Sequence, residues 1–185
     1  GIIHLAGAAI AKRWTESYKK EILESRVNTA NLLYKYAEKY VKNLQFFISA
    51  SGSGYYGQIT SEHIFEENDQ AGTDFIGQVC VDWENAAYQF QKLGSRVVCL
   101  RTSLVLAKNG EGFKLLKKPI QFGVGANLGD GKQWMPWIHI DDLVQMYCDA
   151  ATNNQWNGSY NASSPEMINH ATFNKTLAKK MNKPF

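Results

Sequence analysis

The chain has 185 residues, 44% of them hydrophobic and 20% charged, proportions that are ordinary for a globular protein with a sizeable core. Its formal net charge of +3, from 20 Lys and Arg against 17 Asp and Glu, is too small to indicate a nucleic-acid partner. No apolar run approaches the roughly 20 residues of a membrane span, and three widely spaced cysteines indicate free thiols in a reducing cytoplasm rather than disulfides or a metal site.

Predicted strands and helices alternate along the first half of the chain. Residues 1–6 form a short apolar strand, and residues 16–41 a long helix with apolar residues at alternating steps of four and three. A second strand begins at Phe46 and opens onto a glycine-rich loop. A second helix is expected over residues 75–93, where Gly94 ends it.

The second half continues the alternation. Its expected elements are a strand over 96–102, a helix over 112–122, a glycine-rich loop over 123–131, a helix capped by Asp141 or Asp142 and running to about Thr152, a strand over 158–162 and a helix over 169–182. Strands that alternate with helices predict an α/β fold with a parallel sheet and right-handed crossovers.

The loop after the second strand, residues 52–57, fits the G-x-G-x-x-G pattern of a dinucleotide-binding turn. That pattern needs a helix to begin inside it, so that the pyrophosphate meets the helix N-terminus. The polar segment 58–69 follows instead, without a helical apolar period. We therefore interpret the loop as a ligand-facing loop at the carboxyl end of a strand.

Several segments together resemble a known family. They are His-Leu-Ala-Gly at 4–7, the helix segment 25–33, Tyr-Tyr-Gly at 55–57, the strand 101–106 and Gly-Asp-Gly-Lys-Gln-Trp-Met-Pro-Trp-Ile-His-Ile-Asp-Asp at 129–142. In them the chain resembles the extended short-chain dehydrogenase/reductases, which include nucleotide-sugar epimerases and dehydratases, and within these an atypical subfamily of NAD(P)-dependent epimerase-like proteins.

The resemblance implies a Rossmann-like, three-layer α/β/α fold with a mostly parallel sheet. It also implies one domain over residues 1–185, with substrate-side elements at 112–140 and 163–185. Since the chain opens on a strand and lacks the family's first β-α-β unit, we expect it to be truncated at both ends.

The same resemblance implies that the chain binds NADP(H), with NAD as the alternative. The residues that correspond to cofactor contacts in the family are Leu5, Ala6, Gly7, Glu21, Arg26 and Val105. Arg26 borders the apolar stripe of the long helix, and its guanidinium could pair with a phosphate or a carboxylate. A surface arginine with a packed stem is the alternative interpretation.

The chain departs from the family at the catalytic positions. Short-chain dehydrogenases use a Tyr whose pKa is lowered by a Lys four residues later. Ile76 and Cys80 stand at those positions. Ser51 and Tyr55 are the replacement candidates for a catalytic hydroxyl, with Ser53 as a further one, although small loop residues are more often spacers.

The fourteen-residue segment 129–142 also departs from the family's pattern. Met135 stands where nucleotide-sugar enzymes carry an Arg, and methionine offers no hydrogen-bond donor to a pyrophosphate. Trp134 and Trp137 indicate an aromatic substrate pocket instead. His139 is expected to orient the start of the following helix rather than to take part in catalysis.

Two functions remain open at this point. One is an NAD(P)-dependent oxidoreductase or epimerase acting on an unknown small molecule, with a homodimer among the assemblies that the family allows. The other is a dinucleotide-binding sensor or regulatory protein with little or no turnover, which the loss of both Tyr and Lys favours. A fragment that binds nothing, because its phosphate loop is missing, is the third alternative.

Overall fold

The computed structural model describes residues 1–59, 61–123 and 129–184. These fall into two compact units. The first consists of residues 1–59, 63–101 and 146–161, and the second mainly of 102–145 and 162–185. Most of the glycine-rich loop expected over 123–131 lies outside the described residues.

The main sheet belongs almost entirely to the first unit. Its strands lie in the order β1-β2-β3-β6, and their bounds are Ile2–His4, Phe46–Gly52, Arg96–Thr102 and Gly158–Ala162. Strands β1 and β2 are parallel, with Ile2 opposite Phe47 and His4 opposite Ser49. Five consecutive residues of β3, from Val97 to Arg101, are buried, as expected for a strand covered on both faces.

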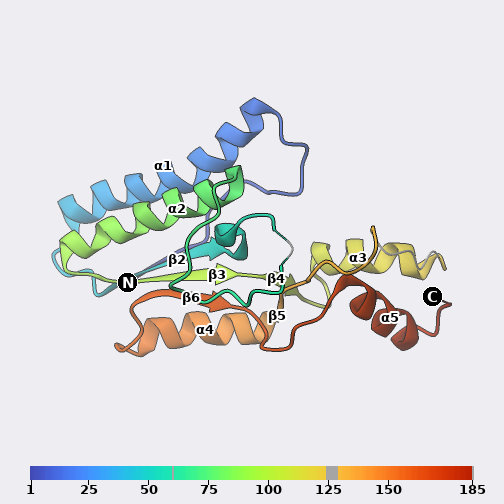
Figure 1. Cartoon of the computed structure of the whole chain (residues 1–185). Coiled ribbons are helices and arrows are strands. Elements are labelled where there is room, and N and C mark those ends of the chain that lie inside the picture. The colour runs from blue at the N-terminus through green and yellow to red at the C-terminus, as the bar shows by residue number, and fades with distance from the viewer. Residues whose placement is uncertain (60, 124–128, 185) are drawn as a thin grey trace. The chain divides into compact units, whose positions relative to one another are not determined.

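Helices cover both faces of this sheet. Helices α1 (Glu16–Tyr40) and α2 (Phe75–Tyr88) run side by side over one face, and the second half of α4 (Ile140–Thr152) lies on the other (Figure 1). The side chains of Thr15 and Asp74 cap α1 and α2 by accepting backbone N–H groups. The three-layer, mostly parallel Rossmann-like fold is therefore confirmed.

The core of the first unit fills the space between the sheet and helices α1 and α2. Phe47 and Phe90 stack with their ring centroids 3.7 Å apart, and both are fully buried. Their buried neighbours are Ala37, Leu44, Ala87, Val97 and Cys99. This packing fixes the amino-terminal part of β2 against the last turns of α1, and the predicted site residues lie at the other end of the strand.

The second unit contains a two-stranded sheet and two helices. Strands β4 (Leu104–Leu106) and β5 (Trp137–His139) pair in parallel, with Val105 opposite Ile138. Helices α3 (Glu111–Gln121) and α5 (His170–Lys180) contact each other. The substrate-side role expected for 112–140 and 163–185 stays a prediction.

Several predicted boundaries need correction. The first strand, expected over 1–6, spans only Ile2–His4, and the last helix, expected over 169–182, spans His170–Lys180. The second predicted helix continues only to Tyr88 as an α-helix and then tightens into the 3₁₀ segment η2 (Gln89–Leu93) before Gly94, whose φ is 75°. Neither Asp141 nor Asp142 caps α4, because the helix already begins at Ile140. His139 occupies the capping position, and its Nδ1 accepts the N–H of Asp141 at 3.2 Å.

Strand β5 was not expected from the sequence, whereas the strands over 96–102 and 158–162 are confirmed to the residue. The segment after Gly57 is not helical where it is described, and α2 begins only at Phe75. No α-helix begins within residues 52–57, which agrees with the interpretation that this loop is not a dinucleotide-binding turn. Among the described helices, none is both long and apolar enough to cross a membrane.

Candidate functional site

The loop that follows β1 is exposed and docks on helix α1. Leu5 is 63% exposed, and Ala6 and Gly7 are exposed as well. The N–H of Ala8 donates to Oγ of Ser25 at 2.9 Å, so the loop backbone is tied to the helix. A Cβ atom on Gly7 would lie 2.9 Å from Cζ of Arg26, so the loop backbone approaches the guanidinium closely, and a larger residue here would require the Arg26 side chain to shift.

Arg26 is buried beneath this loop rather than exposed on the helix surface. Only 8% of it is accessible, its Nη1 donates to the carbonyl of Ile22 at 2.8 Å, and its Nη2 donates to that of Ala8 at 3.1 Å. Its guanidinium also lies 4.8 Å from the ring centroid of Trp83. Burial lowers the pKa of Arg26, as expected for a cation removed from water.

No carboxylate within the described residues lies at ion-pair distance from Arg26. A buried cation without an anion is energetically unfavourable, and two carbonyl contacts leave part of the guanidinium's five N–H groups free. The arrangement therefore suits an anionic ligand. Glu21 lies exposed on the same helix, and its expected part in cofactor binding stays a prediction.

His4, at the end of β1, is a buried polar residue that the sequence analysis did not single out as a site. It is 2% exposed, and its Nδ1 accepts the indole N–H of Trp83 at 3.4 Å. The hydroxyl of Ser49 lies 3.5 Å from Nδ1 but donates its proton to the carbonyl of Ala50. The proton of His4 therefore lies on Nε2, which has no partner among the described residues.

We expect His4 to make the stability of the protein depend on pH. Burial first, and the charge of Arg26 second, lower the pKa of His4 below its ordinary value of 6.5. His4 therefore binds a proton more readily in the unfolded chain than in the folded protein. The contribution of neutral His4 to stability is complete above pH 6.5 and is lost as the pH falls below that value. Urea unfolding at pH 7.5 and at pH 5.5 should show a smaller loss in His4→Asn than in wild type. An equal loss in both proteins would contradict this assignment.

Ser51, one of the two catalytic candidates, lies in a buried polar network at the end of β2. Its hydroxyl donates to Oε1 of Glu84 at 2.7 Å. Arg101 pairs with the same carboxylate through both oxygens, Nε to Oε1 and Nη2 to Oε2, each at 2.9 Å. Ser159 donates to Oε2 at 2.8 Å. Each carboxylate oxygen thus accepts two hydrogen bonds, so the pair is well satisfied.

The Glu84–Arg101 pair is almost completely shielded from water, since both residues are 4% exposed. Burial alone would lower the pKa of Arg101. The hydrogen bonds and charge of Glu84 outweigh that effect and raise the pKa of Arg101 above its ordinary value. Arg101 is therefore a permanent cation inside the first unit.

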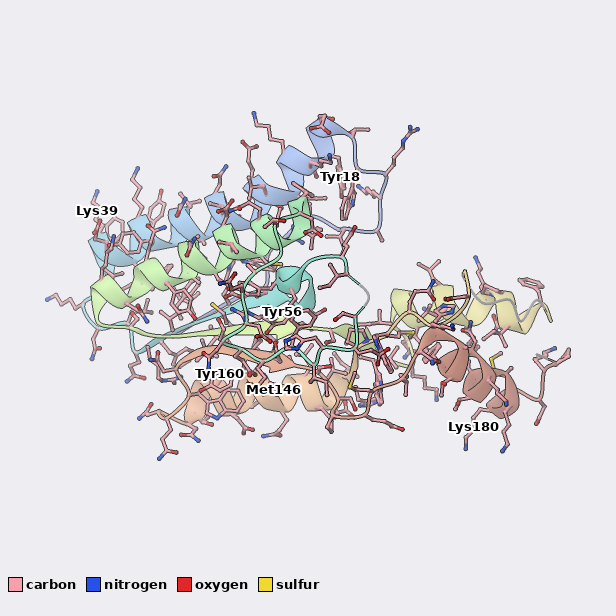
Figure 2. All side chains as sticks on the ribbon, in the orientation of Figure 1. Tyr18, Lys39, Tyr56, Met146, Tyr160 and Lys180 are labelled. Carbon is pink, nitrogen blue, oxygen red and sulfur yellow. The ribbon has the colours of Figure 1, made fainter. Side chains whose placement is uncertain are left out.

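Tyr55 and Tyr56, in the 3₁₀ turn η1 (Ser53–Tyr56), both contact this cation. The guanidinium carbon of Arg101 is 3.3 Å from the ring centroid of Tyr55. Tyr56, labelled in Figure 2, accepts a hydrogen bond from Nη1 of Arg101 at 3.1 Å, and its own hydroxyl lies 2.7 Å from Oδ1 of Asn161. The structure thus connects Ser51 and Tyr55 through one ion pair.

A cavity of about 360 Å³ opens beside this network. Its lining includes Tyr55, Glu67, Glu84, Tyr88, Arg101 and Ser159. Burial raises the pKa of Tyr88 to about 12, so that phenol remains neutral at physiological pH.

The two positions that hold Tyr and Lys in the family face the loop after β2. A Cβ atom on Gly54 would collide with Cγ2 of Ile76, and one on Gly52 would lie 3.7 Å from Sγ of Cys80. Burial raises the pKa of Cys80 to about 11, which keeps its thiol protonated at neutral pH. Neither side chain can serve as the acid–base pair that these positions supply in the family.

The remaining predicted residues belong to the second unit. Trp137 lies opposite Leu104 in the β4–β5 pair, next to the pair formed by Val105 and Ile138. Trp134 forms an isolated bridge with Asn169. The indole nitrogen of Trp137 is buried without a partner in the part of the chain that the structure describes. In this register Val105 and Trp137 lie on opposite faces of the two-stranded sheet, and their contacts with ligands stay predictions.

Glu84, Arg101 and Trp83 were not predicted as site residues from the sequence. A weak signal was present, because Arg101 is a lone charge inside an apolar strand and Glu84 is an acidic residue on the buried side of α2. Charged residues are almost never fully buried unless they are paired. Such isolated charges are therefore candidates for a buried ion pair.

The chain is similar to several known proteins. The pattern of the NAD dependent epimerase/dehydratase family matches residues 1–163. An epimerase family protein of Staphylococcus aureus is 34% identical over 183 residues, which are 99% of this chain and 61% of that relative. This chain therefore spans about three fifths of the length of the curated relatives that it matches.

Two solved structures show the same fold. Human epimerase family protein SDR39U1, solved with NADPH, has a TM-score of 0.89 and 30% identity, covering 98% of this chain and 62% of its own. A nucleoside-diphosphate sugar epimerase from Corynebacterium glutamicum has a TM-score of 0.84 and 34% identity, covering 96% of this chain and 37% of its own. Because the family pattern matches most of its length, the chain belongs to the NAD dependent epimerase/dehydratase family.

Proposed function

We propose that this chain is part of an NADP(H)-dependent oxidoreductase that reduces a small carbonyl compound. The observation that carries the proposal is the buried Arg26 guanidinium, which has no carboxylate partner among the described residues and lies beneath the exposed backbone of Leu5, Ala6 and Gly7. A cation with free N–H groups beside open backbone suits a phosphate of a dinucleotide. NADPH in the human relative supports NADP(H), and NAD is the alternative.

In this proposal Arg26 and the loop 5–7 hold the dinucleotide, and Glu21 contributes from the same helix. Val105 contacts the nicotinamide, while Trp134 and Trp137 line the substrate pocket. When bound, the cofactor supplies or accepts a hydride. The family resemblance also supports a homodimeric, cytoplasmic protein as part of the proposal.

The chain's own contribution to the chemistry is a proton donor, and the geometry favours Tyr55 over Ser51. The Ser51 hydroxyl is buried and donates its single proton to Glu84 at 2.7 Å. The Tyr55 hydroxyl makes no hydrogen bond within the described residues, and its ring lines the cavity beside Arg101. We therefore assign proton transfer to Tyr55, while Ser51 helps to hold Glu84.

A dinucleotide-binding sensor is the second candidate function. The observation that favours it is the pair Ile76 and Cys80, which face the β2 loop without any acid or base. Both functions require the cofactor site, and only the first requires turnover that depends on Tyr55.

We expect Arg26→Met to weaken NADPH binding by about 1.5–3 kcal/mol, the range for a hydrogen bond to a charged group, which is roughly 10- to 150-fold in Kd. Methionine keeps the apolar stem against Trp83 and removes the charge. Fluorescence titration of the full-length protein with NADPH would measure the change. Lys20→Met removes an exposed charge from the same helix and should leave Kd within twofold. An unchanged Kd in Arg26→Met would exclude Arg26 from the cofactor site.

A further inference from the structure

We propose that Arg101, held in place by Glu84, is a positioning residue that fixes the Tyr55 phenol for proton transfer. The proposal deepens the proposed function and rests on it, because it takes Tyr55 as the proton donor. A strand residue thus supports the phenol in this chain, whereas in the family's pattern a lysine on the following helix assists the catalytic tyrosine. In this chain that lysine position is Cys80.

The plane of the Arg101 guanidinium is fixed by contacts around its edge. Nε and Nη2 donate to the two oxygens of Glu84, each at 2.9 Å. Nη1 donates to the hydroxyl of Tyr56 at 3.1 Å and to the carbonyl of Glu67 at 2.9 Å. A planar group with four such contacts, three of them at 2.9 Å, has one orientation available to it.

The fixed guanidinium of Arg101 packs against the Tyr55 ring. The guanidinium carbon lies 3.3 Å from the ring centroid, the shortest cation–ring distance among the described residues. The N–H of Gly72 donates to the carbonyl of Tyr55 at 2.8 Å, which fixes the backbone beneath the ring. With backbone and ring both held, the position of the phenol oxygen follows from the position of Arg101.

The Tyr55 hydroxyl is less constrained than the residues that hold the Tyr55 ring. Glu84, Arg101 and Tyr56 are buried and hydrogen-bonded, whereas Tyr55 is half-buried and its hydroxyl makes no hydrogen bond within the described residues. A ring that is held firmly while its hydroxyl stays without a hydrogen bond suits a proton donor, because the donor must approach the substrate atom in the same geometry at every turnover. Misplacing a reacting group by about 1 Å can reduce a rate by about a hundredfold.

The test compares Arg101→Lys with Arg96→Lys. Lysine at 101 keeps the charge that Glu84 needs but has no planar group to stack on Tyr55. Arg96 lies on the same strand, with its guanidinium carbon 5.7 Å from the ring centroid of Phe46. Its Nη1 donates to the carbonyls of Ala150 and Trp156. Arg96→Lys is therefore the same substitution at an arginine whose contacts do not include Tyr55. NMR of protein labelled with ¹³C in its tyrosine rings, assigned with Tyr55→Phe, would report the Tyr55 ring directly.

We expect the Tyr55 ring signals to move and to show faster ring rotation in Arg101→Lys and to stay unchanged in Arg96→Lys. For a small aldehyde that the wild type reduces, kcat should fall about a hundredfold in Arg101→Lys, while the Kd for NADPH stays within twofold. The solvent isotope effect on kcat should increase, because proton transfer becomes slower. A purely structural role of Arg101 would not change that isotope effect.

Unchanged Tyr55 ring signals in Arg101→Lys would overturn the proposal, and so would a mobile ring with unchanged kcat. A wild-type protein that binds no NADPH, or reduces none of a panel of small aldehydes and ketones, would overturn the proposed function instead. The ring measurement uses the resting protein, so it decides whether Arg101 fixes Tyr55 even in that case.

Discussion

Glu84→Ala is expected to lower the free energy of unfolding by about 3–5 kcal/mol, the usual effect of removing one partner of a buried ion pair. The carboxylate accepts from Arg101, Ser51 and Ser159, and the substitution leaves all three donors without it. Most of this loss in the free energy of unfolding comes from Arg101, which is 4% exposed and would remain a buried cation without its carboxylate partner. Urea unfolding at pH 7.5 would measure the loss.

Two further variants separate this effect from a general sensitivity to substitution. Glu38→Ala removes an exposed glutamate that bonds only a tyrosine hydroxyl on its own helix, and should change stability by less than about 0.5 kcal/mol. The double substitution Glu84→Met and Arg101→Met removes both charges, and should recover part of the loss. A loss below about 1 kcal/mol in Glu84→Ala would show that the pair contributes little to the fold.

The periodic elements of this fold could be predicted from the sequence because their signals are local. Helix α1 carries apolar residues at helical spacing over 25 residues, and its observed bounds, Glu16–Tyr40, differ from the prediction by one residue. The strand Arg96–Thr102 was likewise found from its apolar, β-branched run. Strand β5 was missed because three residues, Trp137–His139, are too few to show a period.

The candidate site could be predicted only in part, since its chemistry depends on contacts between distant residues. The sequence identified Ser51 as a hydroxyl near a ligand loop, but only the fold shows that its proton goes to Glu84, 33 residues away. Arg26 was expected at the edge of the apolar stripe. Its burial follows from Trp83 and from the loop after β1, neither of which belongs to the local pattern of α1.

The same limit applies to Tyr55. Its position in a glycine-rich loop made it one candidate among several small or polar residues. The contact with Arg101 at 3.3 Å distinguishes it, and Arg101 lies 46 positions further along the chain. A lone arginine in an apolar strand indicates a buried partner, but the sequence does not show which ring or carboxylate it meets.

Tyr55→Phe is expected to reduce kcat for NADPH-dependent reduction of a small carbonyl compound by about a hundred- to ten-thousand-fold, the usual contribution of general acid–base catalysis. Ile76 and the protonated thiol of Cys80 cannot replace the missing phenol. The Kd for NADPH should stay within twofold, because the hydroxyl is not among the groups assigned to the cofactor. Ser51→Ala is the matched control in the same network. It should keep kcat within about threefold and lower stability by about 1–3 kcal/mol, because it removes a buried hydrogen bond to a charged carboxylate.

The substrate panel should also include sugar nucleotides, on which we expect no measurable epimerisation by the wild type. Two departures lead to this expectation: the acid–base pair is replaced by Ile76 and Cys80, and the pyrophosphate-binding arginine of the family's pattern is replaced by Met135, which is buried and offers no donor. Rapid epimerisation of a sugar nucleotide would refute the proposed substrate class. Turnover of small carbonyls that persists in Tyr55→Phe would instead leave the reductase function standing and remove Tyr55 as its acid.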